Sequence, residues 1–229
     1  MSVIDEVRTK FRQMKPREFN DPETWLSVLP QLGYNDENPD ELPKEILSQK
    51  GLGLRIWQYP NQFAPYLAWL GLEAMSIRSY LEIGTRHGGT FVVHAEMLRR
   101  LNARFARAVA VDIIDKPALL DSYEYLQLDS QSHEFVEWIA DQFFDLVFID
   151  GDHEYAGVKR DAESTLPRSN IQVFHDIASD ECPGVGKLWK EHRAKHAETH
   201  HFVEFVEQYD SVKGNFFGIG VAIRREWIE

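Results

Sequence analysis

Cysteine occurs only once in the 229 residues, at Cys182, which excludes an internal disulfide framework and a zinc site built from cysteines alone. Long apolar runs are also missing, since no stretch reaches the ~20 residues that a membrane-spanning helix needs. The opening residues, MSVIDEVRTKFRQM, lack the apolar core and cleavage site of a secretion signal, so we expect a cytoplasmic protein without membrane attachment. A nucleic-acid partner is not expected either, because the formal net charge is −12 and such surfaces need a basic stripe.

Three common glycine signatures are missing as well. Residues 84–89 read Gly-Thr-Arg-His-Gly-Gly, and no Lys-Ser/Thr pair follows, which excludes a phosphate-binding loop. The same residues lack the second glycine of the dinucleotide fingerprint, and the nucleophile elbow G-x-S-x-G occurs nowhere. What remains is a nucleoside ligand without phosphates that is held by carboxylates. S-adenosylmethionine fits, because its ammonium, its sulfonium and its ribose hydroxyls suit acidic partners.

The composition, 43% hydrophobic and 27% charged, is that of a globular protein. Residues 1–76 are helical in pattern and form an N-terminal extension or lid, in which Ser2 and Asp21-Pro22 are typical helix starts. In residues 77–229, which we expect to form the catalytic domain, short β runs alternate with helices. The expected strands are 79–83, 107–113, 125–129, 144–150, 171–176, 202–208 and 216–223, and the expected helices are 89–102, 116–123, 131–142, 154–166 and 183–196.

This alternation predicts a doubly wound, mostly parallel seven-stranded sheet of α/β class, Rossmann-like, with helices on both faces. Only the seven residues YDSVKGN join the last two strands. They are too few for a helical crossover, so the last strand is expected to run antiparallel to its neighbour.

Acids close five successive predicted strands. They are Glu82, Asp112, Asp129, Asp150 and Asp176. Ligands of open α/β sheets bind beyond the carboxyl ends of the strands. We therefore expect these side chains to converge on one pocket, with the 84–89 turn as its floor.

These stretches resemble the successive motifs of class I S-adenosylmethionine-dependent methyltransferases. The motifs are YLEIGTRHGGT, VAVDI, LQLDSQS and FDLVFIDGDHEYAGVKRD. With GLRIWQYPNQFAPYLAWL upstream and VFHDI and GVGKLWKE downstream, the likeness is closer to the branch of macrocin-type O-methyltransferases and cephalosporin-hydroxylase-like proteins. It covers roughly residues 50–223.

The resemblance implies a set of cofactor contacts. They are Gly84, Gly88 and Gly89 beneath the methionine part, Thr85 near its carboxylate, Glu82 near its amino end, Asp112 on the ribose hydroxyls, Asp129 and Ser130 near the adenine, and Asp150. Several of these residues also suit a purely structural role. The glycines also suit a plain strand-to-helix turn, and Glu82 also suits bonds to loop amides. Asp112 and Asp129 are also good N-caps for the helices that follow them.

The resemblance also implies a divalent metal at the ends of two neighbouring strands, held by Asp150, His175 and Asp176. Magnesium is the usual ion, although a histidine suits manganese, iron or zinc better. Asp152 or His153 would be the general base. His175 and Asp176 could equally form a structural hydrogen-bonded pair. Here the family's second acid pair is His-Asp, and its Pro-Gly-Gly is replaced by LPRSN.

We therefore expect an enzyme that methylates a hydroxyl of a small molecule, a sugar or natural-product intermediate. A metal-dependent hydroxylase-like enzyme and a non-catalytic partner in a biosynthetic complex are the alternatives. Trp57 to Pro60 are expected either to cover the site or to pack at a helix start. His192 and His196, spaced i, i+4, are expected on a solvated helix. The helical N-terminus offers a surface for packing against a second copy.

Overall fold

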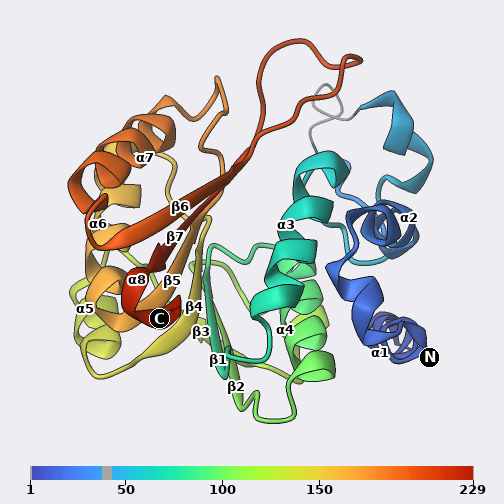
Figure 1. Ribbon diagram of the computed structural model, residues 1–229, viewed down its shortest axis with the longest axis horizontal. Coiled ribbons are helices and arrows are strands. Elements are labelled where there is room, and N and C mark those ends of the chain that lie inside the picture. Colours follow the sequence, from blue (N-terminus) through green and yellow to red (C-terminus); the bar gives the residue numbers. More distant parts are fainter. Residues whose placement is uncertain (1, 38–42, 229) are drawn as a thin grey trace.

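One seven-stranded sheet runs through the molecule (Figure 1), and the computed structural model describes residues 2–37 and 43–228. The strands are β1 (Ser79–Ile83), β2 (Arg107–Asp112), β3 (Glu124–Gln127), β4 (Phe144–Ile149), β5 (Ser169–Phe174), β6 (His200–Phe205) and β7 (Ile219–Arg224). The helices are α1 (Val3–Gln13), α2 (Pro22–Leu32), α3 (Pro60–Glu73), α4 (Gly89–Leu101), α5 (His133–Ala140), α6 (Tyr155–Thr165), α7 (Pro183–His196) and α8 (Arg225–Ile228).

The strand order is β3-β2-β1-β4-β5-β7-β6. The pairs from β3 to β5 are parallel, whereas β7 is antiparallel to both β5 and β6. This confirms the expected fold, including the direction of the last strand. In residues 2–37 and 43–228, no helix has both the length and the apolar character that crossing a bilayer requires.

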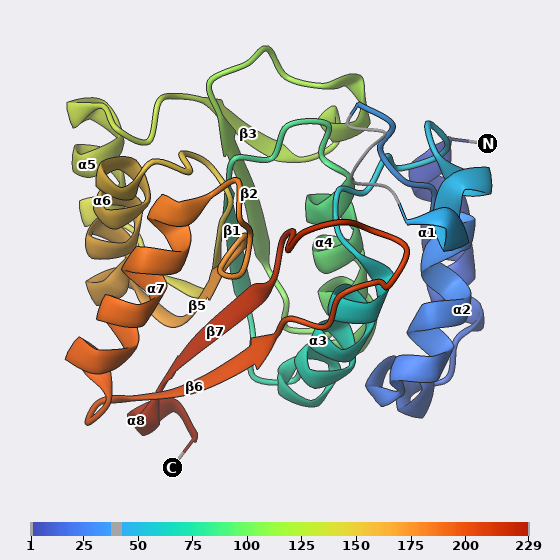
Figure 2. The same cartoon turned by 90° about the horizontal axis from the view of Figure 1, so that it is seen from above.

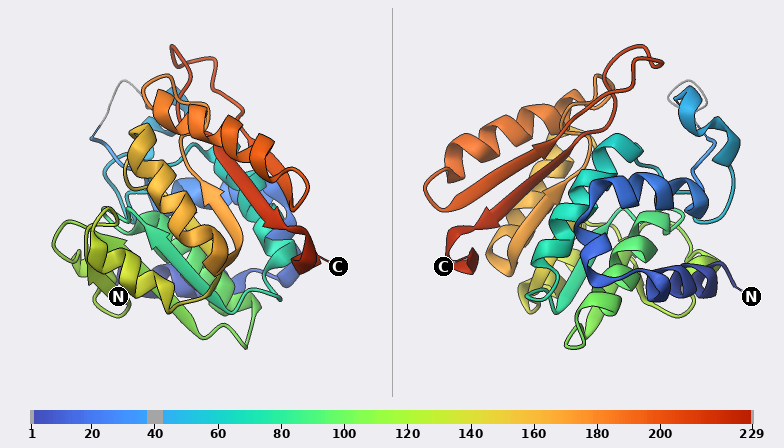
Figure 3. Two further views of the ribbon diagram at one scale, coloured as in Figure 1. Left: turned by 90° about the vertical axis from the view of Figure 1, so that its left-hand side faces the viewer. Right: turned by 45° about the vertical axis from the view of Figure 1, so that its right-hand side comes forward.

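The two faces of the sheet bury two separate cores, because alternate residues of a strand point to opposite sides. Tyr80 and Phe148 face α3 and α4, on the side where α1 and α2 also pack. Leu81 and Val147 face α5, α6 and α7 on the other side. Figures 2 and 3 show these two helical layers, with the N-terminal helices and α7 at opposite sides of the sheet.

The N-terminal helices begin where the sequence predicts. The amide of Asp5 donates to Ser2 Oγ at 3.2 Å, and the amide of Thr24 donates to the Asp21 carboxylate at 3.1 Å. Helix α1 is joined to α4 through Arg8, which donates to the buried Glu96 carboxylate at 2.9 and 3.1 Å. These contacts hold the N-terminal extension against the sheet domain, while the proposed division at residue 76 stays a prediction.

Three predicted elements differ from the structure by three or more residues at one end. Residues 116–123 contain only a three-residue 3₁₀ helix (Ala118–Leu120), because Pro117 itself has extended backbone and β3 already begins at Glu124. The strand predicted over 216–223 begins at Ile219, since Phe217 and Gly218 have φ of +60° and +97°. The strand predicted over 202–208 spans His200–Phe205 instead.

A cluster of three histidines joins α7 to β6. The ring centroids of His192 and His196 lie 4.7 Å apart, and those of His196 and His200 lie 5.7 Å apart. His192 is only 6% exposed and packs against Phe174. The expectation that this helix face is solvated is therefore wrong for His192, because β6 covers it.

Burial and the neighbouring cations set the pKa of these histidines. Burial, with His196, His200 and Lys195 nearby, lowers the pKa of His192 to about 3. Burial likewise lowers the pKa of His200 to about 4. Below the ordinary histidine pKa of about 6.5, the unfolded chain takes up protons that these folded rings refuse. Their contribution therefore lowers the free energy of unfolding as pH falls.

We predict that His192→Phe makes the protein less sensitive to acid. The melting temperature should fall less between about pH 7.5 and about pH 5 than in the wild type, by about 2–4 °C for each 1 kcal/mol of proton linkage removed. Thermal unfolding measured across pH checks this, with the exposed His133→Phe as the matched control. Equal acid sensitivity of wild type and His192→Phe would contradict the prediction.

Candidate functional site

The turn after β1 forms the floor of the site. Gly84 has φ +83°, and a Cβ there would overlap the backbone carbonyl of Asp150 at the end of β4. Its amide donates to the carbonyl of Val111, in β2, at 2.9 Å. Gly88, with φ +85°, then precedes α4. The glycines therefore let three neighbouring strand ends and a helix N-terminus approach closely.

Two cavities open around this turn, with volumes of about 690 and 250 Å³. They share five lining residues, namely Gly84, Arg86, His87, Asp150 and His153. Asp112, Asp129, Ser130 and Asp152 line the larger cavity, whereas Glu82, Thr85, Gly88, Gly89, His175 and Asp176 line the smaller one. Every residue that the sequence nominated for the site thus borders one cavity or both.

In the larger cavity, Asp112 and Asp129 hold loops rather than cap helices. Asp112 accepts hydrogen bonds from the amides of Arg86 and Ile114 at 2.6 and 3.2 Å. Asp129 accepts from the amide of Gln131 at 2.8 Å, and the N-cap of α5 is Ser132. The capping alternatives for both acids are therefore wrong.

Asp161 lies beneath the loop at Ser130 and Gln131. The sequence did not identify it as a site residue. It is fully buried in α6, and the Gln131 side chain donates to it at 3.0 Å. Burial raises the pKa of Asp161 to about 7, although Ser130 and Gln131 oppose that shift. The helical stripe of Val158 and Ala162 was the only available signal, since it predicts that this part of α6 faces the sheet.

Glu82 ends a chain of buried polar side chains behind the smaller cavity. Tyr80 donates a short hydrogen bond to it, and the Tyr80 hydroxyl lies 3.1 Å from His94 Nδ1. His94 Nε2 in turn lies 3.0 Å from the hydroxyl of Tyr66 in α3. Burial raises the pKa of Glu82 well above its ordinary value, although the bond from Tyr80 opposes this. The carboxyl is thus held in one orientation and is easily protonated.

Two acids and two histidines cluster at the ends of β4 and β5. His175 Nδ1 lies 3.0 Å from Asp150 Oδ1 and 3.2 Å from Asp176 Oδ2. His153 Nε2 lies 3.4 Å from Asp150 Oδ1 and 3.0 Å from Asp176 Oδ2. Asp176 has φ +61°, which is uncommon outside glycine and marks a strained position. The tertiary fold therefore brings the two strand ends together as the parallel sheet predicted.

The electrostatics of this cluster favour positive charge on the histidines. Hydrogen bonds to Asp150 and Asp176 raise the pKa of His153 to about 10. Burial opposes protonation of His175, but the same two acids outweigh it and raise its pKa well above the ordinary value. Burial also opposes ionisation of Asp176, but His175 and His153 lower its pKa. The two carboxylates and the two protonated imidazoles therefore neutralise one another, so a metal ion would have to displace the histidine protons.

Cys182 and Asp152 border the cluster differently. Cys182 precedes α7, and its Sγ lies within 4.8 Å of ligand atoms of His153 and Asp176, a proximity that the sequence did not signal. Burial raises the pKa of its thiol to about 12. Asp152 accepts from the amide of Glu154 at 2.9 Å and borders only the larger cavity. Of the two candidate bases, only His153 reaches both cavities.

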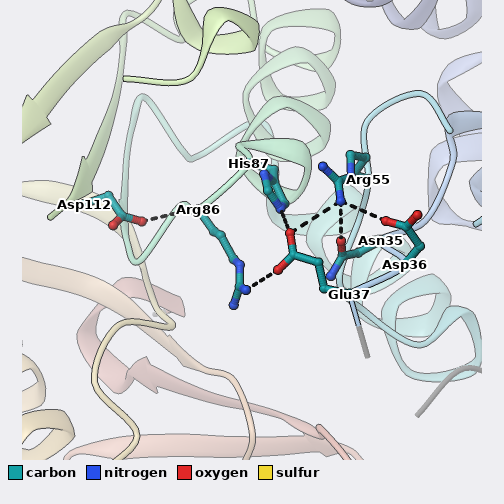
Figure 4. Close-up of polar contacts among 7 residues, drawn as sticks. All are labelled: Asn35, Asp36, Glu37, Arg55, Arg86, His87 and Asp112. Carbon is teal, nitrogen blue, oxygen red and sulfur yellow. Dashed lines mark hydrogen bonds and ion pairs between the residues drawn. The ribbon is translucent and has the colours of Figure 1, made fainter. Parts of the chain in front are cut away.

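The N-terminal segment reaches the glycine turn through an ion-pair network (Figure 4). Glu37 forms short contacts with Arg86 and His87, and Arg55 donates to Asp36 at 2.8 Å. Burial opposes ionisation of Glu37, but His87 and Arg86 outweigh it and lower its pKa. The network therefore holds Glu37 against the glycine turn, although the two are far apart in the sequence.

Aromatic residues line part of the smaller cavity. The guanidinium of Arg86 lies 4.1 Å from the centre of the Trp57 ring. Tyr59 packs on Phe217, in the loop between β6 and β7, at 4.5 Å between ring centroids. Trp57 and Phe217 both line the smaller cavity. The segment at 57–60 thus borders the smaller cavity through Trp57, while Tyr59 packs at the start of α3; that it covers a bound substrate stays a prediction.

Comparison with known proteins places this geometry in context. Residues 81–177 match the family model described as a methyltransferase domain. No curated protein matches the chain. The matched residues run from β1 to just beyond β5, and they include the glycine turn and all of the acids that close these strands.

Solved structures share the fold. An O-methyltransferase from Bacillus cereus in complex with SAH is 16% identical over 97% of this chain and 98% of that chain, with a TM-score of 0.51. MycE methyltransferase from the mycinamycin biosynthetic pathway, in complex with Mg and SAH, is 21% identical over 76% of this chain and 50% of that one, with a TM-score of 0.50. Another MycE structure, with Mg, SAH and mycinamycin VI, is 21% identical over 71% and 49%, with a TM-score of 0.49. The chain therefore spans about half the length of MycE.

We predict that Glu37→Gln loosens the glycine turn. Exchange of the amides of Arg86 to Gly88 with deuterium should accelerate about 2–5-fold, because exposed ion pairs contribute roughly 0.2–1 kcal/mol each. Hydrogen exchange with mass spectrometry checks this. The matched control is Asp36→Asn, which removes a partner of Arg55 without touching the turn. If the amides of Arg86 to Gly88 exchanged equally fast in Glu37→Gln and Asp36→Asn, the proposed stabilisation of the turn by Glu37 would be wrong.

Proposed function

We propose that this chain, which carries a methyltransferase domain of the class I fold, transfers the methyl group of S-adenosylmethionine to a hydroxyl oxygen of a small molecule. One observation carries the proposal: the acids that close β1, β2 and β4 meet around the Gly84 turn in two joined cavities. The natural-product or sugar class of the acceptor is part of the proposal and is suggested by the mycinamycin biosynthetic pathway named with MycE.

Each end of the cofactor has suitable groups. The vicinal ribose hydroxyls can donate to the two oxygens of Asp112, and Asp129 with Ser130 lies beside the adenine. The ammonium pairs with Glu82, which becomes ionised when the cation arrives. Thr85 supports a ligand here independently, since its buried hydroxyl has no hydrogen-bond partner among the residues that the structure describes. A ligand carboxylate would satisfy it.

Methyl transfer needs alignment and a deprotonated nucleophile. The acceptor oxygen attacks the methyl carbon, the carbon–sulfur bond breaks in line, and the hydroxyl proton passes to a base. The smaller cavity would hold the acceptor beside Asp150 and His175, with Trp57 and Phe217 excluding water. Asp152 and His153 remain the candidate bases, and His153 would first have to lose the proton that Asp150 and Asp176 stabilise by raising its pKa.

The residues present fit a divalent cation. Asp150, His175 and Asp176 each offer one donor atom, and these atoms lie within 4.8 Å of one another. When bound, the cation would orient the acceptor hydroxyl and lower its pKa. The chain's own residues would position the cofactor and the acceptor. Asp150 borders both cavities, so it would face the cation on one side and the cofactor on the other.

The helical N-terminal extension would act as a lid in this scheme. Glu37 lines the larger cavity and Arg55 the smaller one. The Ser211 hydroxyl, in the loop between β6 and β7, donates to Glu45 at 2.8 Å, so the N-terminal extension also contacts that loop. The matches reported above are methyltransferases and do not favour a hydroxylase-like enzyme or a non-catalytic partner.

We predict that S-adenosylhomocysteine, the demethylated product, binds and that Asp112→Asn weakens it about 10- to 100-fold, because hydrogen bonds to a charged group contribute about 1.5–3 kcal/mol. Isothermal titration measures both affinities. Asp141→Asn, at the far end of α5, is the matched control and should bind like the wild type. An absence of binding to the wild type at millimolar concentration would sink the proposed function.

We predict that cofactor binding releases a proton from Glu82. The free carboxyl has a raised pKa, whereas the bound ammonium favours the ionised form, so affinity should rise with pH until the free group is fully ionised. Titration calorimetry in buffers of different ionisation enthalpy counts the released protons. Glu82→Gln should release fewer and lose the pH dependence, while equal proton release would contradict the pairing.

A further inference from the structure

We propose that Arg55, Arg86 and His87 form a subsite for a carboxylate group of the acceptor, and that the carboxylate of Glu37 occupies this subsite until the acceptor displaces it. The inference rests on the proposed function, since it names a chemical feature of the molecule that would be methylated. None of these four residues is among the proposed cofactor contacts, metal ligands or bases.

Three side chains contact the one carboxylate of Glu37. Arg86 and His87 form short contacts with it. A terminal nitrogen of Arg55 lies 3.4 Å from its Oε1 atom. Figure 4 shows these side chains converging on Glu37 from the glycine turn and from the segment before α3. Because the planar guanidinium matches the two oxygens of a carboxylate, arginines are the usual residues for binding this group. The chain thus supplies the first occupant of a carboxylate-binding arrangement.

The same three side chains border the cavity proposed for the acceptor. Arg55, Arg86 and His87 all line the smaller cavity, whereas Glu37 lines only the larger one. Between 31% and 54% of each of these side chains is accessible. Such partly exposed ion pairs contribute little to stability, so a carboxylate from outside can displace the internal one. His87 offers a single Nε2 atom, for which the two carboxylates compete.

Backbone strain is concentrated around the smaller cavity. Among the residues that the structure describes, four other than glycine have positive φ, and all four line this cavity. Two of them are Arg55, with φ of +53°, and Arg86, with φ of +44°. Left-handed backbone is unfavourable for residues with long side chains, and folds retain such strain mainly where it positions functional groups. Both arginines of the subsite therefore occupy positions typical of ligand contacts.

Arg86 is also held in place before any ligand arrives. Its backbone amide donates to Asp112 at 2.6 Å, and its guanidinium lies 4.1 Å from the centre of the Trp57 ring. The aromatic ring supports the plane of the guanidinium and leaves its edge available for hydrogen bonds. A carboxylate that binds there therefore orders less of the side chain, which favours binding.

The charge of the chain makes these arginines informative. The formal net charge is −12, so an anionic acceptor needs local cations to approach the site. Arg55 and Arg86 are the only arginines or lysines that line the smaller cavity in the described part of the chain. Burial opposes ionisation of Glu37, but His87 and Arg86 outweigh it and lower its pKa. The subsite thus stabilises a carboxylate in its charged form.

Benzoate and benzamide are the probes, since they differ in charge but little in shape. An aromatic ring suits a cavity lined by Trp57 and Phe217. Nuclear magnetic resonance titration of the full chain, without cofactor, measures the affinity for each probe. The matched controls are Arg193→Gln and Glu204→Gln, because that ion pair has similar exposure and lines neither cavity.

We expect the wild type to bind benzoate about 10-fold more tightly than benzamide, because hydrogen bonds to a charged group are roughly twice as strong as neutral ones. Arg86→Gln should abolish this preference. Glu37→Gln should raise the affinity for benzoate alone by about 2–5-fold, since it removes the internal competitor. The two control variants should bind both probes like the wild type, and circular dichroism confirms that each variant is folded.

Two results would overturn the subsite itself. They are equal affinities of Glu37→Gln for benzoate and benzamide, and failure of Glu37→Gln to bind benzoate. A benzoate affinity that is the same in Glu37→Gln and in the wild type would overturn the role of Glu37 as the internal occupant.

A second titration separates the acceptor from the cofactor, which carries a carboxylate of its own. Arg86→Gln should affect S-adenosylhomocysteine and 5′-methylthioadenosine equally, although the latter lacks the amino-acid part. Weaker binding of S-adenosylhomocysteine alone would assign the subsite to the cofactor and overturn its assignment to the acceptor.

The two titrations also separate this inference from the proposed function. Binding of S-adenosylhomocysteine without any preference for benzoate would overturn only the subsite. A preference for benzoate that depends on Arg86, but no binding of S-adenosylhomocysteine, would support the carboxylate subsite and overturn methyl transfer.

Discussion

Parallel strands concentrate negative charge at one edge of this sheet, and much of the structure compensates for it. Glu82, Asp112 and Asp150 end three neighbouring strands around Gly84 and line the two cavities. Each is stabilised differently: Glu82 by Tyr80 and a raised pKa, Asp112 by backbone amides, and Asp150 by two histidines. A cationic ligand bound here would neutralise more of the negative charge, which the protein's own groups offset only in part.

The segments beside the two cavities also respond to the negative charge at this edge of the sheet. The residues over the cavities supply cations and aromatic surface, with Arg86 stacked on Trp57 and paired with Glu37. Because Glu37 lies outside the matched residues 81–177 and contacts the turn at residues 84–89, the covering of this turn depends on the N-terminal segment. Arg8, bonded to the buried Glu96, anchors those helices to α4, the helix that the glycine turn begins. The N-terminal helices and the glycine turn are thus parts of one connected network.

Most of the fold could be predicted because its signals are local. Short apolar runs alternate with helical patterns, and the short connection before β7 forces that strand to reverse. The helix predicted over 116–123 is wrong, since Pro117 is extended and β3 follows closely at Glu124. The start of β7 was misplaced because positive φ angles at Phe217 and Gly218 have no clear signature in an apolar run. His192 was misjudged because its burial depends on β6, which a helical pattern does not reveal.

For the site, the sequence by itself determined which residues close the strands. It thereby also determined which edge of the sheet carries the acids. Both follow from chain direction and side-chain periodicity, which are properties of the local chain. Only the tertiary structure decided that His153 and Cys182 lie against Asp176, that Asp161 supports the loop at Ser130, and that Glu37 reaches Arg86. Those contacts depend on loop conformations and on packing between distant segments. No spacing along the chain encodes them, since the distance between two loop residues is set by everything that packs between them.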